Sequence, residues 1–198
     1  MTVQPDGRGG EWRVVDVVVG AVLGVAFGAV FQAWNVLWTA VGPVFVALPP
    51  LQGLMYGVWL LPAVLVPLVI RRPGAALLGE LVAAVASALF GAPWGLLTIL
   101  YGLAQGGAAE LVFGIGLYRR WGLPTAVLAG AAAGGAAVLL DLALYYPAWS
   151  GQWQATYAGL VIPSAAIIAG LGGWLLVRAL ARTGVLSPFS AGREQPEV

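Results

Sequence analysis

The chain has 198 residues, of which 61% are hydrophobic and only 9% are charged, and its net charge is +1. Because about a quarter of the residues of a soluble domain are charged, this composition predicts a membrane protein. The sequence contains no Lys, His or Cys. It therefore excludes a polybasic nucleic-acid-binding surface, disulfides, and every catalytic or metal site that needs His or Cys. We expect no metal and no cofactor.

Residues 1–13 are polar and Gly-rich and predict a short cytoplasmic lead. A membrane helix is predicted over residues 14–35, because this apolar stretch exceeds the roughly 7–15 residues of a signal-peptide core and lacks a clear cleavage site. A cleaved signal peptide is the alternative. Gly20, Gly24 and Gly28 follow at four-residue spacing, which is typical of close helix contact. They could pack within the bundle or dock onto another membrane protein.

The next two segments are apolar and rich in proline. Residues 36–52 contain three prolines and predict an irregular or re-entrant outer loop that could cover a pocket. A second helix is predicted over residues 52–70, with kinks at Pro62 and Pro67.

Residues 71–120 predict a hairpin of two membrane helices with an Arg pair at each end. Each apolar run is long enough to cross a bilayer, which takes about 20 residues. Two crossings return the chain to its starting side, and the positive-inside rule makes that side the cytoplasm. Each helix carries one glutamate, Glu80 or Glu110, roughly 12–14 Å from the level of the Arg pairs. Carboxylates at this depth usually face a bundle interior or a cavity.

A fifth helix is predicted over residues 123–146 and a sixth over residues 158–180, with an uncharged aromatic loop between them. Six crossings with both termini in the cytoplasm leave none of the nine Arg residues in an outer loop. The predicted fold is thus an all-α bundle of six transmembrane helices over residues 14–182. Residues 183–198 predict a partly disordered cytoplasmic tail. We find no internal repeat, which disfavours an inverted-repeat transporter.

Polar and aromatic residues gather toward the predicted outer ends of the helices. Asp141 lies about 7 Å below the outer end of its helix and is expected to line a cavity. Tyr101 and Gln105 share one helix face. The aromatic residues at this level are Trp34, Trp38, Tyr56, Trp94 and Tyr145. Together these residues predict an outward-facing pocket for a flat, partly cationic heteroaromatic molecule. The alternative for the aromatic residues is a membrane-interface belt.

The remaining carboxylates have more local interpretations. Glu80 shares a face with Ser87, whereas Glu110 faces away from Gln105 and is a candidate structural or gating carboxylate that hydrogen-bonds a neighbouring helix. Asp16 is predicted to be a helix-start residue. An intramembrane enzyme is disfavoured, because the sequence contains neither an HExxH metal pair nor a Ser/His couple.

Several stretches resemble the YkoE family of S components, the substrate-capture subunits of energy-coupling-factor (ECF) importers. They are IRRPGAALLGELVAA, the turn GAPWG, QGGAAELVF, YGVW and TGVL, and the resemblance extends over about residues 12–186. It implies a six-helix S component without its own ATPase, in the plasma membrane of a prokaryote. The resemblance also implies binding of thiamine or its hydroxymethylpyrimidine precursor, and association with a transmembrane coupling (T) subunit and ATP-binding subunits. In such importers small residues of the first helix contact the coupling protein, which assigns Gly20, Gly24 and Gly28 to partner docking.

Two positions depart from the family pattern, since an acidic residue is common at Ser87 and Asn at Ala92. The predicted ligand-binding residues are Asp141, Gln105, Tyr101, Glu80, Trp34, Trp38, Tyr56, Trp94, Tyr145, Glu110 and Ser87. Asp141 or Glu80 is expected to pair with a cationic or amino group, and Gln105 to bond the pyrimidine edge. The alternative functions are a small channel or secondary transporter that uses Glu80 and Glu110 as a proton or cation site, and a structural scaffold without a ligand.

Overall fold

The computed structural model describes residues 11–193, and its regular elements are all helices. The α-helices are α1 (Val14–Val41), α2 (Leu61–Ile70), α3 (Ala75–Leu89), α4 (Leu97–Ile115), α5 (Leu123–Leu144), α6 (Gly151–Ala165), α7 (Gly173–Arg182) and α8 (Ser190–Arg193). Two 3-10 helices, η1 (Gly42–Phe45) and η2 (Pro49–Leu60), lie between α1 and α2, and a π-helix, η3 (Ala166–Gly172), joins α6 to α7. The prediction of an all-α chain is confirmed.

Five helical segments within residues 11–193 are long and apolar enough to cross a membrane. They are Val14–Phe45, Pro49–Ile70, Leu97–Ile115, Leu123–Leu144 and Gly151–Arg182. α3 is apolar but has only 15 residues. It therefore measures about 22 Å, which is shorter than the hydrocarbon core of about 30 Å.

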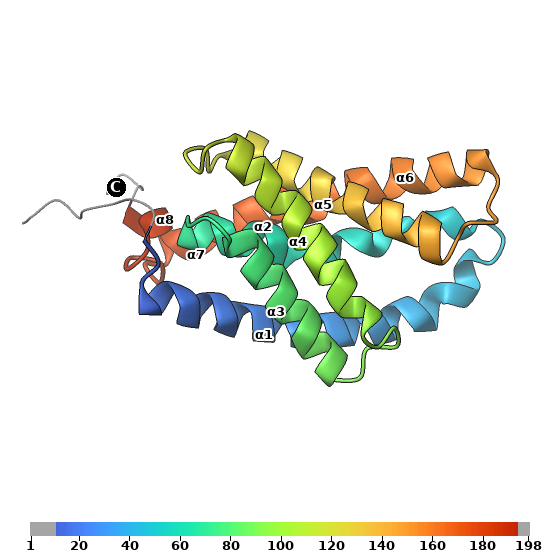
Figure 1. The fold of residues 1–198 in the computed structure, drawn as a ribbon, viewed down its shortest axis with the longest axis horizontal. Coiled ribbons are helices and arrows are strands. Elements are labelled where there is room, and N and C mark those ends of the chain that lie inside the picture. Colours follow the sequence, from blue (N-terminus) through green and yellow to red (C-terminus); the bar gives the residue numbers. More distant parts are fainter. Residues whose placement is uncertain (1–10, 194–198) are drawn as a thin grey trace, which may run out of the picture.

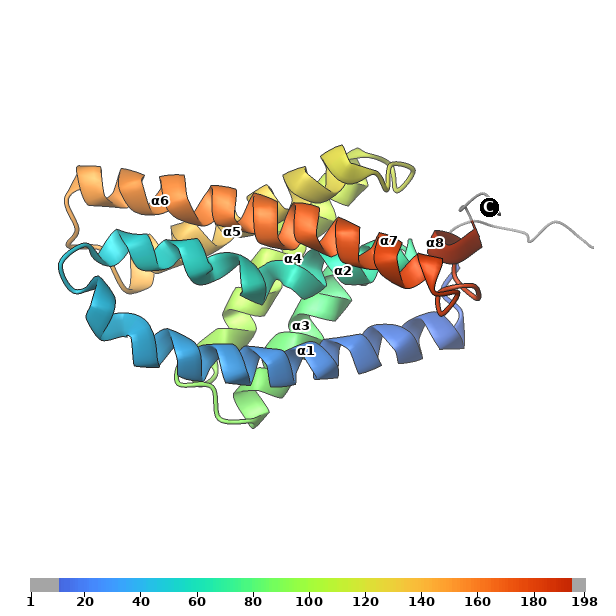
Figure 2. The same ribbon diagram turned by 180° about the vertical axis from the view of Figure 1, so that it is seen from behind.

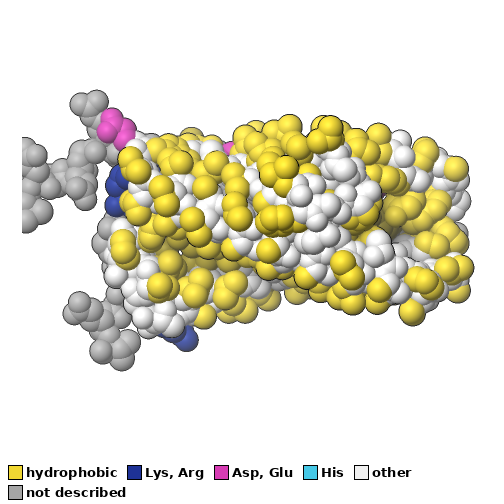
Figure 3. Space-filling view, turned by 90° about the horizontal axis from the view of Figure 1, so that it is seen from below, with side chains coloured by type: hydrophobic (Ala, Val, Ile, Leu, Met, Phe, Trp, Pro, Cys, Tyr) yellow, Lys and Arg dark blue, Asp and Glu magenta, His cyan; other side chains and the backbone are white. Residues whose placement is uncertain are grey.

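The connections that carry the Arg pairs lie at one end of the bundle, here named the arginine end. Figures 1 and 2 place the start of α1, the α2–α3 and α4–α5 connections, α7 and α8 at this end. The η1–η2 region and the α5–α6 connection form the far end, and the α3–α4 connection projects from the side. On the face seen in Figure 3, arginine side chains gather at the arginine end and hydrophobic side chains cover most of the remaining length.

α2 occupies the centre of the bundle. Every residue from Pro62 to Ile70 is buried, because α2 packs against α1, α3, α5 and α7. Pro62 lies in the first turn of α2, where the missing N–H breaks no helical hydrogen bond. The predicted second helix is therefore a composite, in which a 3-10 segment from Pro49 precedes a short α-helix. η2 has 12 residues, whereas 3-10 helices rarely exceed about four.

The glycine stripe of α1 packs within the chain. Gly20, Gly24 and Gly28 are buried on the face of α1 that contacts α3. A Cβ atom at Gly24 would lie 2.7 Å from Val82 and 3.2 Å from the carbonyl oxygen of Gly79. Their small size lets the two helices approach closely, so the structure supports packing within the bundle, the first of the two predicted roles. Docking of a partner protein at these glycines stays a prediction.

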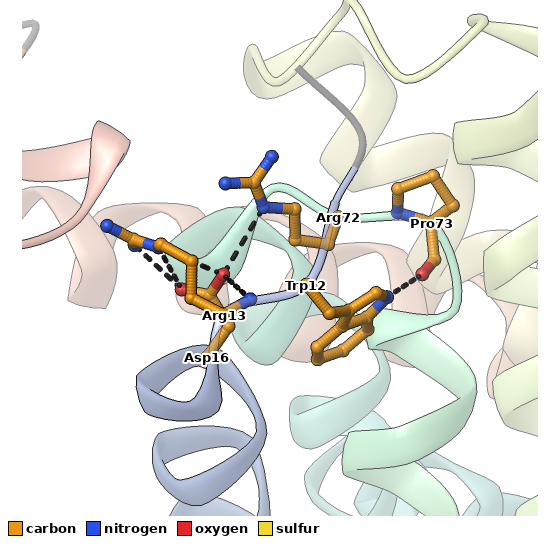
Figure 4. Close-up of polar contacts among 5 residues, drawn as sticks. All are labelled: Trp12, Arg13, Asp16, Arg72 and Pro73. Atoms are coloured by element: carbon orange, nitrogen blue, oxygen red, sulfur yellow. Dashed lines mark hydrogen bonds and ion pairs between the residues drawn. The ribbon is translucent and has the colours of Figure 1, made fainter. Parts of the chain in front are cut away.

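Ion pairs and a hydrogen bond join the start of α1 to the α2–α3 connection (Figure 4). Asp16 is fully buried and forms ion pairs with Arg13 (2.7 Å) and Arg72 (3.3 Å), so its carboxylate links two segments of the arginine end. The indole N–H of Trp12 donates to the carbonyl oxygen of Pro73 at 3.0 Å. Asp16 also accepts a hydrogen bond from the backbone N–H of Arg13, which agrees with its predicted role at the helix start.

Two predicted helix boundaries differ from the structure by several residues, and part of the predicted tail packs against the core. α1 continues to Val41, because the first helix-breaking residues after position 35 are Gly42 and Pro43. The sixth helical segment begins at Gly151 rather than at residue 158, since Ser150 caps it by accepting from the backbone N–H of Trp153. The tail is partly ordered, because Leu186, Phe189 and Ala191 join the buried core. Residues 1–10 and 194–198 of the predicted lead and tail lie outside the described range.

Candidate functional site

A cavity of about 110 Å³ lies among α1, η2, α3, α4, α5 and α6. Nine aromatic side chains line it: Phe31, Trp38, Tyr56, Trp59, Trp94, Tyr101, Tyr145, Tyr146 and Tyr157. The other lining residues are Glu80, Ala84, Ser87, Thr98, Gly102, Gln105 and Asp141. Most of these residues come from the halves of α1, α3, α4 and α5 that are farther from the arginine end, whereas Glu80 lies deeper.

The structure brings most of the predicted site residues together. Nine of the eleven line this cavity: Asp141, Gln105, Tyr101, Glu80, Trp38, Tyr56, Trp94, Tyr145 and Ser87. Trp34 and Glu110 are not among its lining residues, and neither is Ala92. The indole N–H of Trp34 instead donates to the carbonyl oxygen of Met55 at 3.0 Å and holds η2 against α1.

Asp141 is the most highly connected carboxylate of the cavity. It is 5% exposed, and its two oxygens accept hydrogen bonds from the phenols of Tyr101 on α4 (2.5 Å) and Tyr157 on α6 (2.8 Å). These bonds tie three helices together at the cavity wall. A carboxylate has about four lone-pair sites, so Asp141 can still accept a hydrogen bond from a bound molecule.

Three other side chains of the cavity have polar atoms without a hydrogen-bond partner in the part of the chain that the structure describes. Glu80 is 1% exposed, and among the described residues its only hydrogen bond is from the backbone N–H of Ala63 to Oε2, at 2.9 Å. The Oγ1 atom of Thr98 is buried without a partner. The structure gives the Gln105 amide no hydrogen bond to another described residue, although Gln105 is only 4% exposed. Buried polar groups are nearly always hydrogen-bonded, so these three call for partners inside the cavity.

Four of the aromatic rings form a connected wall. The ring of Trp59 lies 4.8 Å from Trp38, 5.2 Å from Tyr56 and 5.5 Å from Trp94, measured between centroids. Such rings present flat apolar surface for stacking and negative faces for a cation. With two carboxylates and no Arg among the lining residues, the cavity favours a flat ligand that is neutral or positively charged.

Two tyrosines of the α5–α6 connection, Tyr145 and Tyr146, are among the lining residues of the cavity. Burial, followed by the nearby Asp141 carboxylate, raises the pKa of Tyr145. The same two causes, with Tyr145 itself, raise the pKa of Tyr146. Both phenols therefore stay protonated at neutral pH and can donate hydrogen bonds.

Glu110 has a structural role at the start of α3. Its carboxylate accepts from the backbone N–H groups of Gly74 (2.6 Å), Ala76 (2.9 Å) and Leu77 (3.4 Å). These are among the N–H groups that a helix N-terminus leaves without intrahelical partners. The prediction that Glu110 contacts the ligand is corrected, whereas its interpretation as a structural carboxylate bonded to a neighbouring helix agrees with these contacts. Glu80 and Glu110 accept hydrogen bonds from different backbone segments, which argues against one ion site shared by the two carboxylates.

We expect Glu110→Ala to lower the free energy of unfolding by about 2 kcal/mol, because three N–H groups of α3 lose their acceptor. Thermal unfolding in detergent, followed by circular dichroism, measures this loss. Glu110→Gln retains one side-chain oxygen and is the matched control, with a smaller expected loss. An unchanged midpoint in Glu110→Ala would contradict the capping role.

Seven lining residues were outside the predicted set: Phe31, Trp59, Ala84, Thr98, Gly102, Tyr146 and Tyr157. Two of them carried a usable signal. Thr98 precedes Tyr101 by three residues and Gln105 by seven, which places it on the same face of α4. Tyr157 follows the cap residue Ser150 by seven residues, so recognition of that cap would have placed Tyr157 two turns inside a helix rather than in a loop.

Comparisons with known proteins agree with this architecture. Residues 15–136 match the family model described as the permease component of an ABC-type cobalt transport system. The protein YkoE of Bacillus subtilis (strain 168), named as an HMP/thiamine permease protein, is 34% identical over 189 residues, which are 93% of this chain and 92% of the relative. A crystal structure of an S-component of an ECF transporter superposes with a TM-score of 0.89 at 32% identity and covers 93% of both chains.

Proposed function

Because this chain belongs to the YkoE family of ECF-transporter S components, we propose that it captures thiamine or hydroxymethylpyrimidine from outside the cell. It delivers the ligand together with a transmembrane coupling subunit and ATP-binding subunits. The observation that carries the proposal is a set of polar atoms inside an aromatic cavity, on Glu80, Thr98 and Gln105, that have no hydrogen-bond partner among residues 11–193.

The chemistry of the cavity suits an aminopyrimidine. The Gln105 amide offers both a donor and an acceptor to the edge of a heterocycle. Asp141 and the free oxygen of Glu80 can accept from an amino group or pair with a cationic ring. The wall of Trp38, Tyr56, Trp59 and Trp94 can hold a flat ring by stacking. Both named relatives are transport proteins, which confirms the prediction that the chain is not an enzyme.

We propose six membrane crossings, with α3 as the short one and with both termini in the cytoplasm. The arginine end then faces the cytoplasm, in keeping with the positive-inside rule. The cavity, which lies toward the far end, is within reach of ligands from outside. α3 needs less length than the other helices, because its connection to α4 projects from the side of the bundle short of the far end (Figures 1 and 2).

Cobalt, which the description of the matching family names, is a poorer candidate ligand. Within residues 11–193, no group of three or more His, Cys, Asp or Glu could hold a metal ion. The cavity offers two carboxylates among nine aromatic rings. First-row transition metals in proteins are held by several imidazole, thiolate or carboxylate ligands, so this lining fits an organic ligand better.

Titration of the purified protein with hydroxymethylpyrimidine and with thiamine, followed by tryptophan fluorescence, tests the proposed function. Trp38, Trp59 and Trp94 line the cavity, so a bound heterocycle is expected to change the emission in a saturable way. Adenine serves as a control heterocycle of different shape. Gln105→Leu leaves the aromatic wall in place and is expected to weaken binding several-fold, because it removes the amide. No saturable response to either pyrimidine compound would overturn the proposal.

A further inference from the structure

Asn35 lies behind the cavity wall rather than in it. It is 2% exposed and continues the buried face of α1 that also contains Gly28. Its side-chain oxygen accepts from the indole N–H of Trp59 at 2.9 Å, and its amide nitrogen donates to the hydroxyl of Ser87 at 3.3 Å. Asn35 is not among the lining residues, but Trp59 and Ser87 both are. One buried amide thus connects two lining residues from different elements, η2 and α3.

Trp59 is the central ring of the aromatic wall. Trp38, Tyr56 and Trp94 all pack against it, with centroid distances between 4.8 and 5.5 Å. The indole N–H is the one polar group of a tryptophan side chain and can only donate. In this structure that N–H donates to Asn35. The orientation of the central ring is therefore set by a residue that a bound ligand does not contact.

The close approach of α1 and α3 brings Asn35 within reach of Ser87. A Cβ atom at Gly28 would lie 3.1 Å from the backbone nitrogen of Ser87, so a larger residue would push the helices apart at this level. Asn35 follows Gly28 by seven residues, which is two helical turns along the same face. The third contact of the amide is the side-chain oxygen of Gln32 on α1 itself, at 3.3 Å.

We infer that Asn35 is a positioning residue for ligand binding, which acts by fixing the Trp59 ring and the Ser87 hydroxyl. This inference rests on the proposed function for the identity of the ligand, but its geometric part concerns the ligand-free protein. Loss of Asn35 leaves the Trp59 N–H without an acceptor and frees the central ring of the wall to rotate. The expected consequence is weaker binding without loss of any ligand-contacting group.

The indole N–H signals of the protein labelled with ¹⁵N at tryptophan test the geometric part. The Trp59 signal is assigned by its disappearance in Trp59→Phe. Asn35→Ala is expected to shift it, while the signal of Trp12, which is bonded to Pro73 at the arginine end, stays in place. Gln32→Ala is the matched control, because it removes a bond to Asn35 but retains the bond to Trp59. An unmoved Trp59 signal in Asn35→Ala overturns the inference.

Titration with hydroxymethylpyrimidine and thiamine tests the functional part through a double-mutant cycle. Asn35→Ala is expected to weaken binding about tenfold in the wild-type background, but less than threefold in Trp59→Phe, where the N–H is already absent. Equal losses in both backgrounds overturn the inference. If the wild-type protein binds neither compound, the proposed function fails, while the indole signal still decides whether Asn35 positions Trp59.

If Asn35→Ala does not fold, a second variant, Asn35→Asp, tests the inference. Asn35→Asp retains a side-chain oxygen for the Trp59 N–H and is expected to keep the Trp59 signal near its wild-type position. A Trp59 signal in Asn35→Asp that matches a free indole overturns the inference.

Discussion

Asp141→Asn is expected to weaken the binding of hydroxymethylpyrimidine or thiamine at least tenfold, which corresponds to about 1.4 kcal/mol. The substitution removes the negative charge from the wall of the cavity and replaces an acceptor oxygen with an amide nitrogen that can only donate. It also weakens the bonds by which Tyr101 and Tyr157 are held to α5. Fluorescence titration or calorimetry of the purified variant in detergent measures the change in affinity.

Glu110→Gln is a matched control for Asp141→Asn, because it makes the same chemical change on a neighbouring helix outside the cavity lining. We expect Glu110→Gln to leave ligand affinity unchanged and to lower only the thermal stability. Tyr157→Phe separates the two effects at Asp141, since it removes one phenol bond and keeps the carboxylate. Wild-type affinity in Asp141→Asn would remove Asp141 from the binding site.

The sequence placed correctly those polar residues that lie in otherwise apolar helices. Asp141 and Gln105 lie in long apolar helices, and a buried carboxylate or amide in such a helix indicates a cavity or a partner. The position of Tyr101 followed from helical periodicity alone, because it is one turn from Gln105. All three line the same cavity. Hydropathy and periodicity were sufficient here, since both are properties of a single helix.

The residues that the sequence misplaced depend on contacts between helices. Glu110 has the same hydropathy signal as Glu80, but it reaches the start of α3 and bonds three backbone N–H groups. The periodicity of α4 turns Glu110 away from Gln105 and indicates a contact with a neighbouring helix, but it does not show that this contact is with the backbone N–H groups of α3. Trp34 was misplaced for a similar reason, because its partner is a backbone carbonyl of η2, 21 residues away.

A helix boundary accounts for one of the missed aromatic residues, Tyr157. The segment from Pro147 to Tyr157 contains aromatic and polar residues and was predicted to be a loop, but α6 begins at Gly151. Tyr157 thus lies inside a helix and points its phenol at Asp141. The π-helix η3 lies between α6 and α7, where Pro163 precludes one regular backbone hydrogen bond. Apolar composition alone gives no warning of either feature.

Gly24→Leu is expected to lower the free energy of unfolding by about 3 kcal/mol, because the glycine stripe of α1 is a packing surface within the chain. The first added carbon would already lie 2.7 Å from Val82, and α3 cannot retreat without breaking the bond between Asn35 and Ser87. The thermal unfolding midpoint in detergent measures the loss. Ligand affinity is expected to fall as well, since Ser87 lines the cavity.

Gly135→Leu is the matched control, because Gly135 lies on α5 with no atom within 4 Å of a Cβ at that position. We expect this variant to unfold near the wild-type temperature and to bind ligand normally, since the added side chain meets open space or lipid. A purely external role for the stripe predicts the opposite pattern for Gly24→Leu, with a stable, ligand-binding protein that fails only to co-purify with its coupling subunit. That outcome would indicate that Gly20, Gly24 and Gly28 contact the coupling subunit. It would also require α1 and α3 to separate when the partner binds.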